Sequence, residues 1–373
     1  MSGPFGVYVH VPFCAARCDY CAFATWTDRT HLMAAYAAAC RREVHEARLP
    51  AATSVFFGGG TPSLLPAPLL VSVLDAIPRT GDAEVTVECN PETVTPALLD
   101  AYGAAGVTRV SFGVQSMVPA VLRSLGRAHE PASVVRAVSA ARAAGLASFN
   151  VDLIHGGAGE SAADWRATLE QVLALEPPHV SAYALTVEPG TALARDPARH
   201  PDDDDQADKY LLADAVLTAA GLRSYEISNW ARPGHECRHN LLYWSQGDYR
   251  GIGCAAHSHV GGRRWWNVRT PERYIALVGA GASPVAGEEC LDGPTRRLEG
   301  LQLGLRTSSG VPASALPDTG DGALDGLVER RGGRAVLTVE GRLLANEVAL
   351  RLRLGTDPPW QERSGRGRSA SGW

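Results

Sequence analysis

A repeated alternation of strand-like and helix-like segments constrains the fold of this 373-residue chain more than any other feature. Six short β-rich runs alternate with longer stretches rich in Ala and Leu; the runs are Val7–Val11, Ser54–Phe57, Glu84–Glu88, Thr108–Phe112, Ala147–Leu153 and His179–Leu185. Strands and helices that alternate in this way form a parallel sheet, because each helix returns the chain to the start of the next strand. Six units are fewer than a closed eightfold barrel needs, so we predict an α/β fold: an open partial (β/α)6 barrel of TIM-like type.

One of the intervening helices is marked at both ends. Pro131 stands near its first turn, and Gly145 provides a stop. Apolar residues follow at helical spacing between these two positions: Val134, Val135, Val138 and Ala141. We therefore predict a helix here. By contrast, the acidic run Asp202–Asp205 predicts a solvated loop, because like charges repel one another and resist burial.

The pattern changes along the chain, which indicates several parts. We expect the partial barrel to occupy residues 1–230, and an aromatic-rich segment, 231–293, to pack on it. Residues 294–355 contain a helix at 296–305, a strand at 336–338 and a helix at 343–352, which predicts a small, winged-helix-like α/β domain. Residues 356–373 are polar and rich in Gly, Ser and Arg, and we expect a disordered tail.

Composition excludes several classes of protein. The 35 basic and 40 acidic residues leave a net charge of −5, which argues against nucleic acid as the main partner. No apolar run approaches the roughly 18 to 20 residues that span a bilayer. The segment Met1–Phe13 also lacks the features of a secretory signal, so we expect a cytoplasmic protein.

Unusual residues follow the strands at their carboxyl ends, where the loops of a parallel βα array converge. Three cysteines, Cys14, Cys18 and Cys21, follow the first strand. The later strands are followed by a triple glycine with Thr61 and Pro62, and then by Glu88, Gln115, Asp152 and Ala184 in turn. This shared placement predicts one functional site at this edge of the sheet.

The spacing of the three cysteines suits one metal centre, because three ligands on one loop leave a coordination position open. Two alternatives remain at this point: a zinc site completed by a distant ligand, or unrelated buried thiols. The triple glycine would let the backbone approach a ligand closely, although a tight turn explains it as well. Taken singly, Glu88, Gln115, Arg127 and Asp152 could be ordinary capping or solvated residues.

Together, these motifs resemble the radical S-adenosylmethionine superfamily. The pattern C-x3-C-x2-C is followed by GGGTP, E-x-N-P-E, SFGVQS and NVDLI, and YVHVPFC resembles the oxygen-independent coproporphyrinogen III oxidase group. The resemblance implies a 4Fe-4S cluster on Cys14, Cys18 and Cys21, whose open iron binds S-adenosylmethionine and, when reduced, can cleave it to a 5'-deoxyadenosyl radical. It also implies a set of cofactor-pocket residues: Tyr8, Tyr20, Gly59, Gly60, Thr61, Glu88, Gln115, Arg127, Asp152 and Ala184.

A second informative region carries four of the eight tryptophans, between Tyr225 and Trp266. Planar apolar side chains beside His and Cys could form a slot for a flat macrocycle, or simply an aromatic core patch. The run His239-Asn240-x-x-Tyr243-Trp244 resembles the H-N-x-x-Y-W mark of the HemW-type haem chaperones. Oxidases of the group carry a further cysteine two residues after the third, where this chain has Phe23.

The resemblance therefore implies a chaperone that binds haem and delivers it to acceptor haemoproteins, such as respiratory cytochromes or bacterioferritin. The alternative is an enzyme that decarboxylates coproporphyrinogen III oxidatively to protoporphyrinogen IX, and whether any radical reaction occurs stays open. The resemblance is also compatible with a homodimer and with transient association with a membrane surface.

For the haem ligand, the residue types favour His239, with Cys237 as a thiolate alternative. Asn240, Tyr243 and Trp244 are the other residues expected at the haem site. His257 and His259 form a lesser candidate pair, for which we favour structural roles. The loop His155–Glu160 departs from the group, whose members read more like Y-G-L-P-G-Q, and it borders the expected cofactor pocket.

Overall fold

The computed structural model describes residues 3–317 and 320–354. Contacts divide the chain after Leu291 into two compact units, and each is described here by itself. The predicted disordered tail, residues 356–373, lies outside the described residues.

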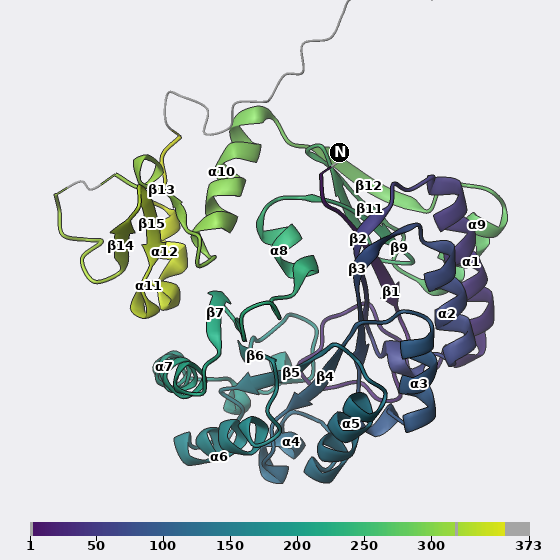
Figure 1. The fold of residues 1–373 in the computed structure, drawn as a ribbon, viewed down its shortest axis with the longest axis horizontal. Coiled ribbons are helices and arrows are strands. Elements are labelled where there is room, and N and C mark those ends of the chain that lie inside the picture. The colour runs from purple at the N-terminus through teal and green to yellow at the C-terminus, as the bar shows by residue number, and fades with distance from the viewer. Residues whose placement is uncertain (1–2, 318–319, 355–373) are drawn as a thin grey trace, which may run out of the picture. The chain divides into compact units, whose positions relative to one another are not determined.

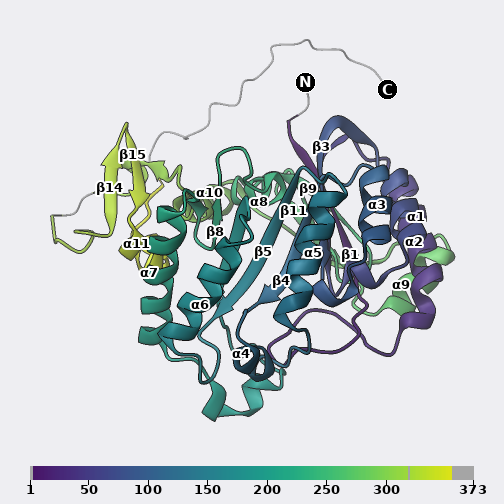
Figure 2. The ribbon, with the colours of Figure 1, turned by 60° about the horizontal axis from the view of Figure 1, so that its bottom comes forward.

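The first unit contains the predicted six parallel strands in sequential order: β1 (Phe5–Val11), β2 (Ala52–Gly59), β3 (Arg79–Cys89), β4 (Arg109–Gln115), β5 (Ser148–His155) and β6 (His179–Ala184). Helices on the outer side connect them, as Figures 1 and 2 show. These helices are α1 (Met33–Ala47), α2 (Ala67–Ala76), α3 (Pro96–Ala104), α4 (Pro119–Ser124), α5 (Pro131–Ala143), α6 (Ala162–Leu173) and α7 (Asp203–Ala219). The structure confirms the predicted open (β/α)6 arrangement.

Further strands at both edges widen this sheet to twelve strands. Beyond β1, in order toward that edge, lie β9 (Asp248–Ile252), β10 (His257–Val260), β11 (Arg263–Asn267) and β12 (Val285–Cys290). Next to β6 lie β8 (Asn229–Ala231) and β7 (Arg223–Glu226), while helices α8 (Arg238–Trp244) and α9 (Pro271–Gly279) complete the unit. The aromatic-rich segment therefore contributes strands to the same sheet, and β9 pairs with β1 in parallel.

Side chains on the parallel strands alternate between two buried environments, because successive residues of a strand point to opposite faces. Val7 and Val9 on β1 are buried on the face that carries the helices. On the inner face, several strands present polar residues instead; these include Thr86, Ser111, Asn150 and His179. The sheet thus has an apolar outer face and a polar inner face.

Helix α5 begins at Pro131, as predicted, and Gly145 lies just beyond its end with a positive φ of 67°. Val134 and Val138 are buried, but Val135 is 45% exposed and does not belong to the packed face. The predicted loop at Asp202–Asp205 was wrong, because these residues begin α7. Asp202 is the N-cap and accepts from the amide of Asp205 at 2.9 Å. Carboxylates are favourable at this position because the first amides of a helix lack intrahelical acceptors.

The second unit begins with α10 (Gly293–Leu305) and contains a three-stranded sheet in the order β13-β15-β14. Its strands are β13 (Val311–Pro312), β14 (Val328–Arg331) and β15 (Arg334–Leu337). In place of one helix over residues 343–352, two short helices, α11 (Val339–Leu343) and α12 (Ala345–Ala349), flank Leu344. The backbone of Leu344 leaves the helical region, with φ −105° and ψ 25°. The winged-helix-like class of this unit stays a prediction.

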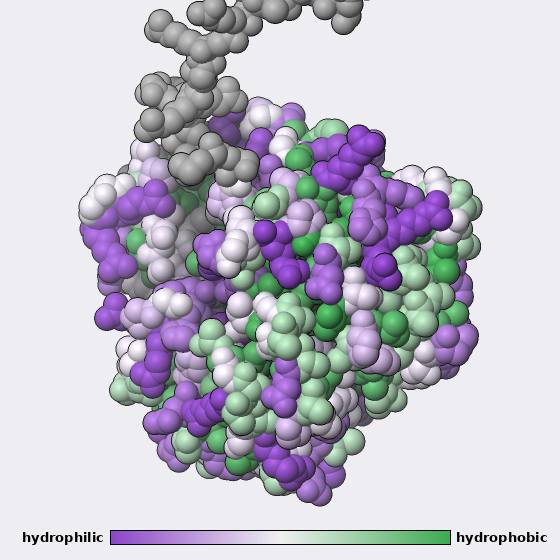
Figure 3. Space-filling model, turned by 45° about the vertical axis from the view of Figure 1, so that its right-hand side comes forward, coloured by the Kyte–Doolittle hydropathy of each residue, from purple (hydrophilic) through white to green (hydrophobic). Residues whose placement is uncertain are grey.

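Short 3-10 helices complete the described structure: η1 (Thr30–Leu32), η2 (Pro62–Leu64), η3 (Pro91–Thr93), η4 (Leu193–Arg195), η5 (Pro197–Arg199) and η6 (Ala313–Ala315). Of the helices in the described residues, none has both the length and the apolar character to cross a membrane. On the face seen in Figure 3, hydrophilic and hydrophobic residues are interspersed.

Candidate functional site

The three predicted metal ligands lie on the loop that follows β1. The amide of Cys14 donates to the carbonyl of Trp26 at 3.1 Å, and the amide of Trp26 donates to Pro12 at 2.8 Å, which closes the loop at its base. Cys14 is buried, whereas Cys18 and Cys21 are half-buried. Burial raises the pKa of the Cys14 thiol and of the Cys21 thiol. Metal ligation needs the thiolate, so a bound cation must supply the stabilisation that burial removes.

Across the described ranges, no three His, Cys, Asp or Glu side chains are grouped in a way that could hold a metal ion. The cysteines therefore share one loop without forming a preassembled ligand set. The glycine-rich loop after β2 packs against this loop: the amide of Gly60 donates to Val11 and that of Thr61 to Phe13, both at 2.8 Å. A Cβ at Gly60 would lie 2.7 Å from the Phe13 carbonyl oxygen and 3.0 Å from the Cys14 sulfur. Only glycine fits this approach.

Arg127 places a cation beside the cysteine loop. Its Nη1 donates to the Cys18 sulfur at 3.4 Å, and its Nη2 donates to Asn90 Oδ1 and to the Gly113 carbonyl at 3.1 and 3.0 Å. Its Nε and the Oε1 of Gln115 are buried, and neither has a hydrogen-bond partner in the described part of the chain. Gln115 also has a positive φ of 64°, an uncommon backbone state for a residue with a side chain. Unsatisfied buried atoms of this kind suit a polar ligand.

The inner face of the sheet holds a cavity of about 250 Å³. It unites the two sites that the sequence predicted separately. Four of the predicted cofactor residues and four of the predicted haem residues line it: Tyr8, Gly59, Glu88 and Asp152, and Cys237, His239, Asn240 and Tyr243. Small-molecule sites typically measure roughly 300–1,000 Å³, so this cavity is slightly smaller than that range.

Two carboxyl groups in the cavity, those of Glu88 and Asp152, have different hydrogen-bond partners. Glu88 accepts from the amide of Gly59 at 3.1 Å, and burial, with the nearby charge of Asp152, raises the pKa of Glu88 to about 8. Asp152 accepts from Ser111 at 2.7 Å and from Asn150 at 2.8 Å. Burial also raises the pKa of Asp152, although these hydrogen bonds oppose the shift. Both groups can accept from ligand hydroxyl or ammonium groups when ionised.

The remaining predicted cofactor residues lie outside the cavity lining. Tyr20 packs against an apolar cluster that includes Ile154 and Leu185. Thr61 is buried, and its hydroxyl contacts the Cys14 sulfur at 3.7 Å. Ala184 is exposed at the end of β6, and Trp244 is half-buried on α8. The structure therefore gathers part of the predicted set and leaves the others around it.

His239 is fully buried, and both of its ring nitrogens have partners. Nδ1 lies 2.9 Å from Ser54 Oγ and Nε2 lies 2.9 Å from Tyr243 Oη, while Phe56 stacks on the ring at 5.4 Å. Burial lowers the pKa of His239 to about 3, so the ring is neutral. Burial likewise raises the pKa of the Cys237 thiol to about 12. Iron ligation at His239 therefore requires one of its two hydrogen bonds to break.

Sequence reasoning missed a buried polar network beneath the cavity. His179 lies 2.6 Å from Asn150 Oδ1 and 2.8 Å from Tyr225 Oη, and Tyr225 Oη accepts from the amide of Cys237 at 3.4 Å. The sequence contained one indication of this network. Asn150 precedes Asp152 by two residues and alternates with the apolar residues Phe149, Val151 and Leu153, which places Asn150 and Asp152 on the same face of the strand.

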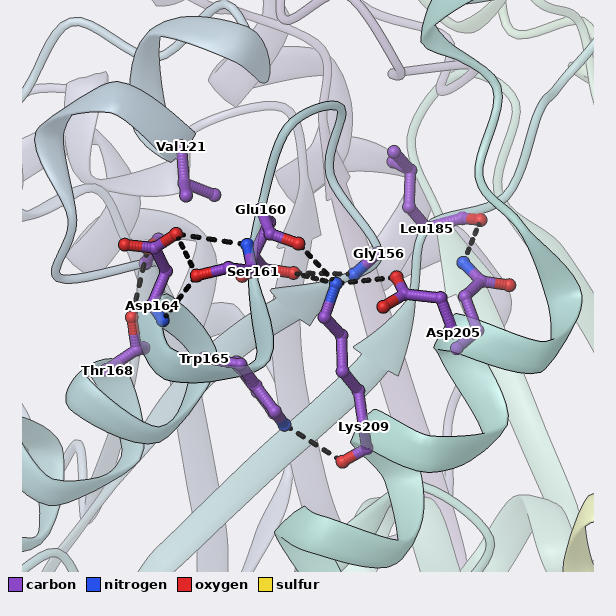
Figure 4. A network of polar contacts seen from close by, with 12 residues as sticks. Val121, Gly156, Glu160, Ser161, Asp164, Trp165, Thr168, Leu185, Asp205 and Lys209 are labelled. Carbon is purple, nitrogen blue, oxygen red and sulfur yellow. Dashed lines mark hydrogen bonds and ion pairs between the residues drawn. The ribbon is translucent and has the colours of Figure 1, made fainter.

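A buried lysine supports the loop after β5, as Figure 4 shows. Lys209 on α7 is the only lysine in the sequence, and its side chain is 1% exposed. Its Nζ donates to the Glu160 carbonyl at 2.7 Å and to Asp205 at 2.6 Å, and lies 3.5 Å from the Glu160 carboxylate. Glu160 also accepts from the amide of Gly156 at 2.7 Å. The i,i+4 spacing of Asp205 and Lys209 was the sequence signal for part of this network.

Comparisons with known proteins agree with the geometry. A model described as the radical SAM superfamily matches residues 8–172. The protein named heme chaperone HemW from Mycobacterium tuberculosis (strain ATCC 25618 / H37Rv) is 44% identical over 369 residues, which cover 92% of this chain and 94% of that protein. Heme chaperone HemW from Escherichia coli (strain K12) is 41% identical over 69% of this chain and 70% of that protein.

A solved structure also shares the fold. Coproporphyrinogen III oxidase (HemN) from Escherichia coli superposes with a TM-score of 0.81 over 93% of this chain and 89% of that one, at 24% sequence identity. At this identity the likeness supports the fold alone. The family model and the identity with these relatives together define a radical SAM protein. Within that superfamily, the identity over almost the full length places the chain in the HemW family, as the sequence motifs predicted.

Proposed function

We propose that this protein is a haem chaperone that holds a 4Fe-4S cluster and S-adenosylmethionine. The identity of 44% with a protein named heme chaperone HemW, over 92% of this chain, carries the proposal. The H-N-x-x-Y-W run and Phe23 support it, because both distinguish the chain from the oxidases of the group.

The arrangement of the cysteine loop supports cluster and cofactor binding. Cys14, Cys18 and Cys21 would hold the cluster, and Gly60 lets the glycine-rich loop pack closely against the Cys14 end of the cysteine loop. Bound together, the cluster and S-adenosylmethionine supply one-electron chemistry. Arg127 can pair with the cofactor's carboxylate, while Glu88 can accept from hydroxyl groups.

The shared cavity supports a link between cofactor and cargo. Glu88 and Tyr8 on the cofactor side and His239 and Tyr243 on α8 line the same space. A cofactor bound beside Glu88 and Tyr8 would therefore change the environment of His239 and Tyr243. On this proposal, cofactor binding regulates haem release to an acceptor haemoprotein, such as a respiratory cytochrome or bacterioferritin, by a chaperone that acts as a homodimer or at a membrane surface.

The deciding experiment is an anaerobic haem titration of the cluster-loaded full chain, followed by the Soret band. We expect saturable binding of a single haem per chain, and transfer to an apo-haemoprotein when the two are mixed. Absence of saturable binding would overturn the proposal. Decarboxylation of coproporphyrinogen III, assayed in parallel, tests the oxidase alternative.

A further inference from the structure

The inner face of the sheet continues beyond β1 onto β9, β10, β11 and β12. Residues that pair directly across neighbouring strands present their side chains on the same face. His259 pairs with Tyr249, and the Tyr249 ring lies 4.5 Å from the ring of Tyr243, which lines the cavity. His257 precedes His259 by two residues and pairs with Trp266. His257 and Trp266 therefore lie on the same face as the cavity.

His257 is held in a fixed orientation and remains accessible. Its ring stacks on the indole of Trp266, with centroids 5.7 Å apart and planes 27° apart. Trp266 in turn lies across Gly287 on β12, where a Cβ would come within 2.6 Å of the indole. The His257 side chain is exposed, and neither ring nitrogen has a hydrogen-bond partner among residues 3–317 and 320–354. An imidazole of this kind is preoriented for a ligand.

His257 also stands next to the cofactor edge. The Nε2 of His10 donates to the carbonyl of Ala24, on the cysteine loop, at 2.9 Å, and a Cβ at Gly59 would lie 2.5 Å from the His10 ring. Burial lowers the pKa of His10 to about 4, and the neighbouring His257 contributes to the shift. Phe23, adjacent to Ala24, is 65% exposed and lines the mouth of the cavity. Phe23 therefore adjoins the residue that holds the His10 ring.

We propose that His257 supplies an axial ligand to haem on the inner face of β10 and β11. Trp266 fixes the imidazole plane, and Phe23 offers an apolar contact for the macrocycle. This inference rests on the proposed haem cargo. It differs from ligation at His239, whose nitrogens are engaged in the interior beside a small cavity. A chaperone must also release its cargo, and a ligand at the surface permits exchange without unfolding of α8.

The test compares His257→Ala with a matched control, His45→Ala, which removes an exposed histidine from α1. Both are made in the full chain, loaded with cluster and titrated anaerobically with haem. We expect His257→Ala to weaken haem binding at least tenfold and to change the axial-ligand signature of ferric haem in electron paramagnetic resonance spectra. Added imidazole should restore that signature, and His45→Ala should behave as the unmodified chain.

A second variant, His257→Gln, preserves the size of the side chain but does not ligate haem iron as imidazole does, and we expect it to match His257→Ala. Cluster absorbance in both variants reports that the fold is intact. Unchanged affinity and an unchanged spectrum in both would overturn the inference. If the unmodified chain itself binds no haem saturably, the proposed function fails instead. If the unmodified chain and both His257 variants bind alike while His239→Ala does not, the cargo site lies on α8 and only this inference fails.

Discussion

The cysteine edge of the sheet and the His239 side chain on helix α8 differ in whether their buried polar atoms have hydrogen-bond partners. At the cysteine edge, Arg127 Nε and Gln115 Oε1 are buried without partners in the described chain, and two thiols are half-buried. On α8, both nitrogens of His239 are satisfied by hydrogen bonds from different elements. Buried polar groups normally find partners within the protein, so groups without partners mark a place for a ligand. The comparison predicts a polar ligand at the first region, and it shows that the hydrogen bonds of His239 hold its ring in place on α8.

Removing one cysteine tests the ligand-binding side of this comparison and should have the largest effect. We expect Cys18→Ser to lose the cluster almost completely, because two thiolates on the loop cannot replace three. Iron and sulfide content after anaerobic reconstitution, with the charge-transfer absorbance, measures this. Cys290→Ser is the matched control, since Cys290 is exposed on β12. Stoichiometric zinc in the unmodified protein would contradict the cluster.

Lys209 tests whether a satisfied buried group supports the fold near the cofactor edge. Lys209→Met leaves the Glu160 carboxylate, whose side chain is 0% exposed, without its cation. We expect a loss of about 3–5 kcal/mol in the free energy of unfolding, the usual cost of breaking a buried pair. Urea denaturation measures it. In the double variant Lys209→Met/Glu160→Gln most of the stability should return; equal loss in both variants would refute the pairing argument.

Tyr243→Phe sharpens the comparison on α8. It removes the hydroxyl at 2.9 Å from His239 Nε2 and leaves that buried nitrogen without a partner. We expect a loss of about 1–3 kcal/mol in the free energy of unfolding, with cluster loading unchanged. Tyr249→Phe serves as the control, because the Tyr249 hydroxyl has no hydrogen-bond partner among the described residues, and it should change stability by about 0.5 kcal/mol or less. Equal losses in the two variants would show that the hydrogen bond contributes nothing.

The pH dependence of stability tests the cavity carboxyl group Glu88, which is half-buried, and should give the smallest effect, since partial exposure to solvent screens charge. The folded pKa of about 8 lies above the ordinary value of 4.5. Between these values the folded chain retains a proton that the unfolded chain releases, so stability should fall as pH rises through this window. Glu88→Gln should reduce that fall. Identical pH profiles of the unfolding free energy for the variant and the unmodified chain would contradict the raised pKa.

Much of the fold was predictable because its signals are local. The six strands fall within a few residues of their predicted positions, and α5 begins at the predicted Pro131. Local signals failed where a neighbour decided the outcome. The acidic run begins a helix because its carboxylates cap the first amides, and Asp205 pairs with Lys209. Val135 was predicted on the buried face of α5 with Val134, but its side chain is 45% exposed.

In the candidate site, too, local sequence predicted some features and distant segments decided the others. Spacing alone placed Cys14, Cys18 and Cys21 on one loop, and it placed Glu88 and Asp152 at the ends of their strands. Spacing did not reveal that α8 closes the same cavity, since His239 and Ser54 are 185 positions apart in the chain. Nor did it show that the ring nitrogens of His257, unlike those of His239, have no hydrogen-bond partner in the described part of the chain.

The sequence by itself determined the six βα units, the cysteine loop and the family, because periodicity and short spacings act between residues that are close along the chain. Only the tertiary structure decided which polar groups are satisfied. It buried the single lysine against Glu160, engaged both nitrogens of His239, and left His257 stacked on Trp266 and accessible. Whether a polar atom has a partner depends on what the fold brings to it from distant segments, and that decides whether it stabilises the protein or awaits a ligand.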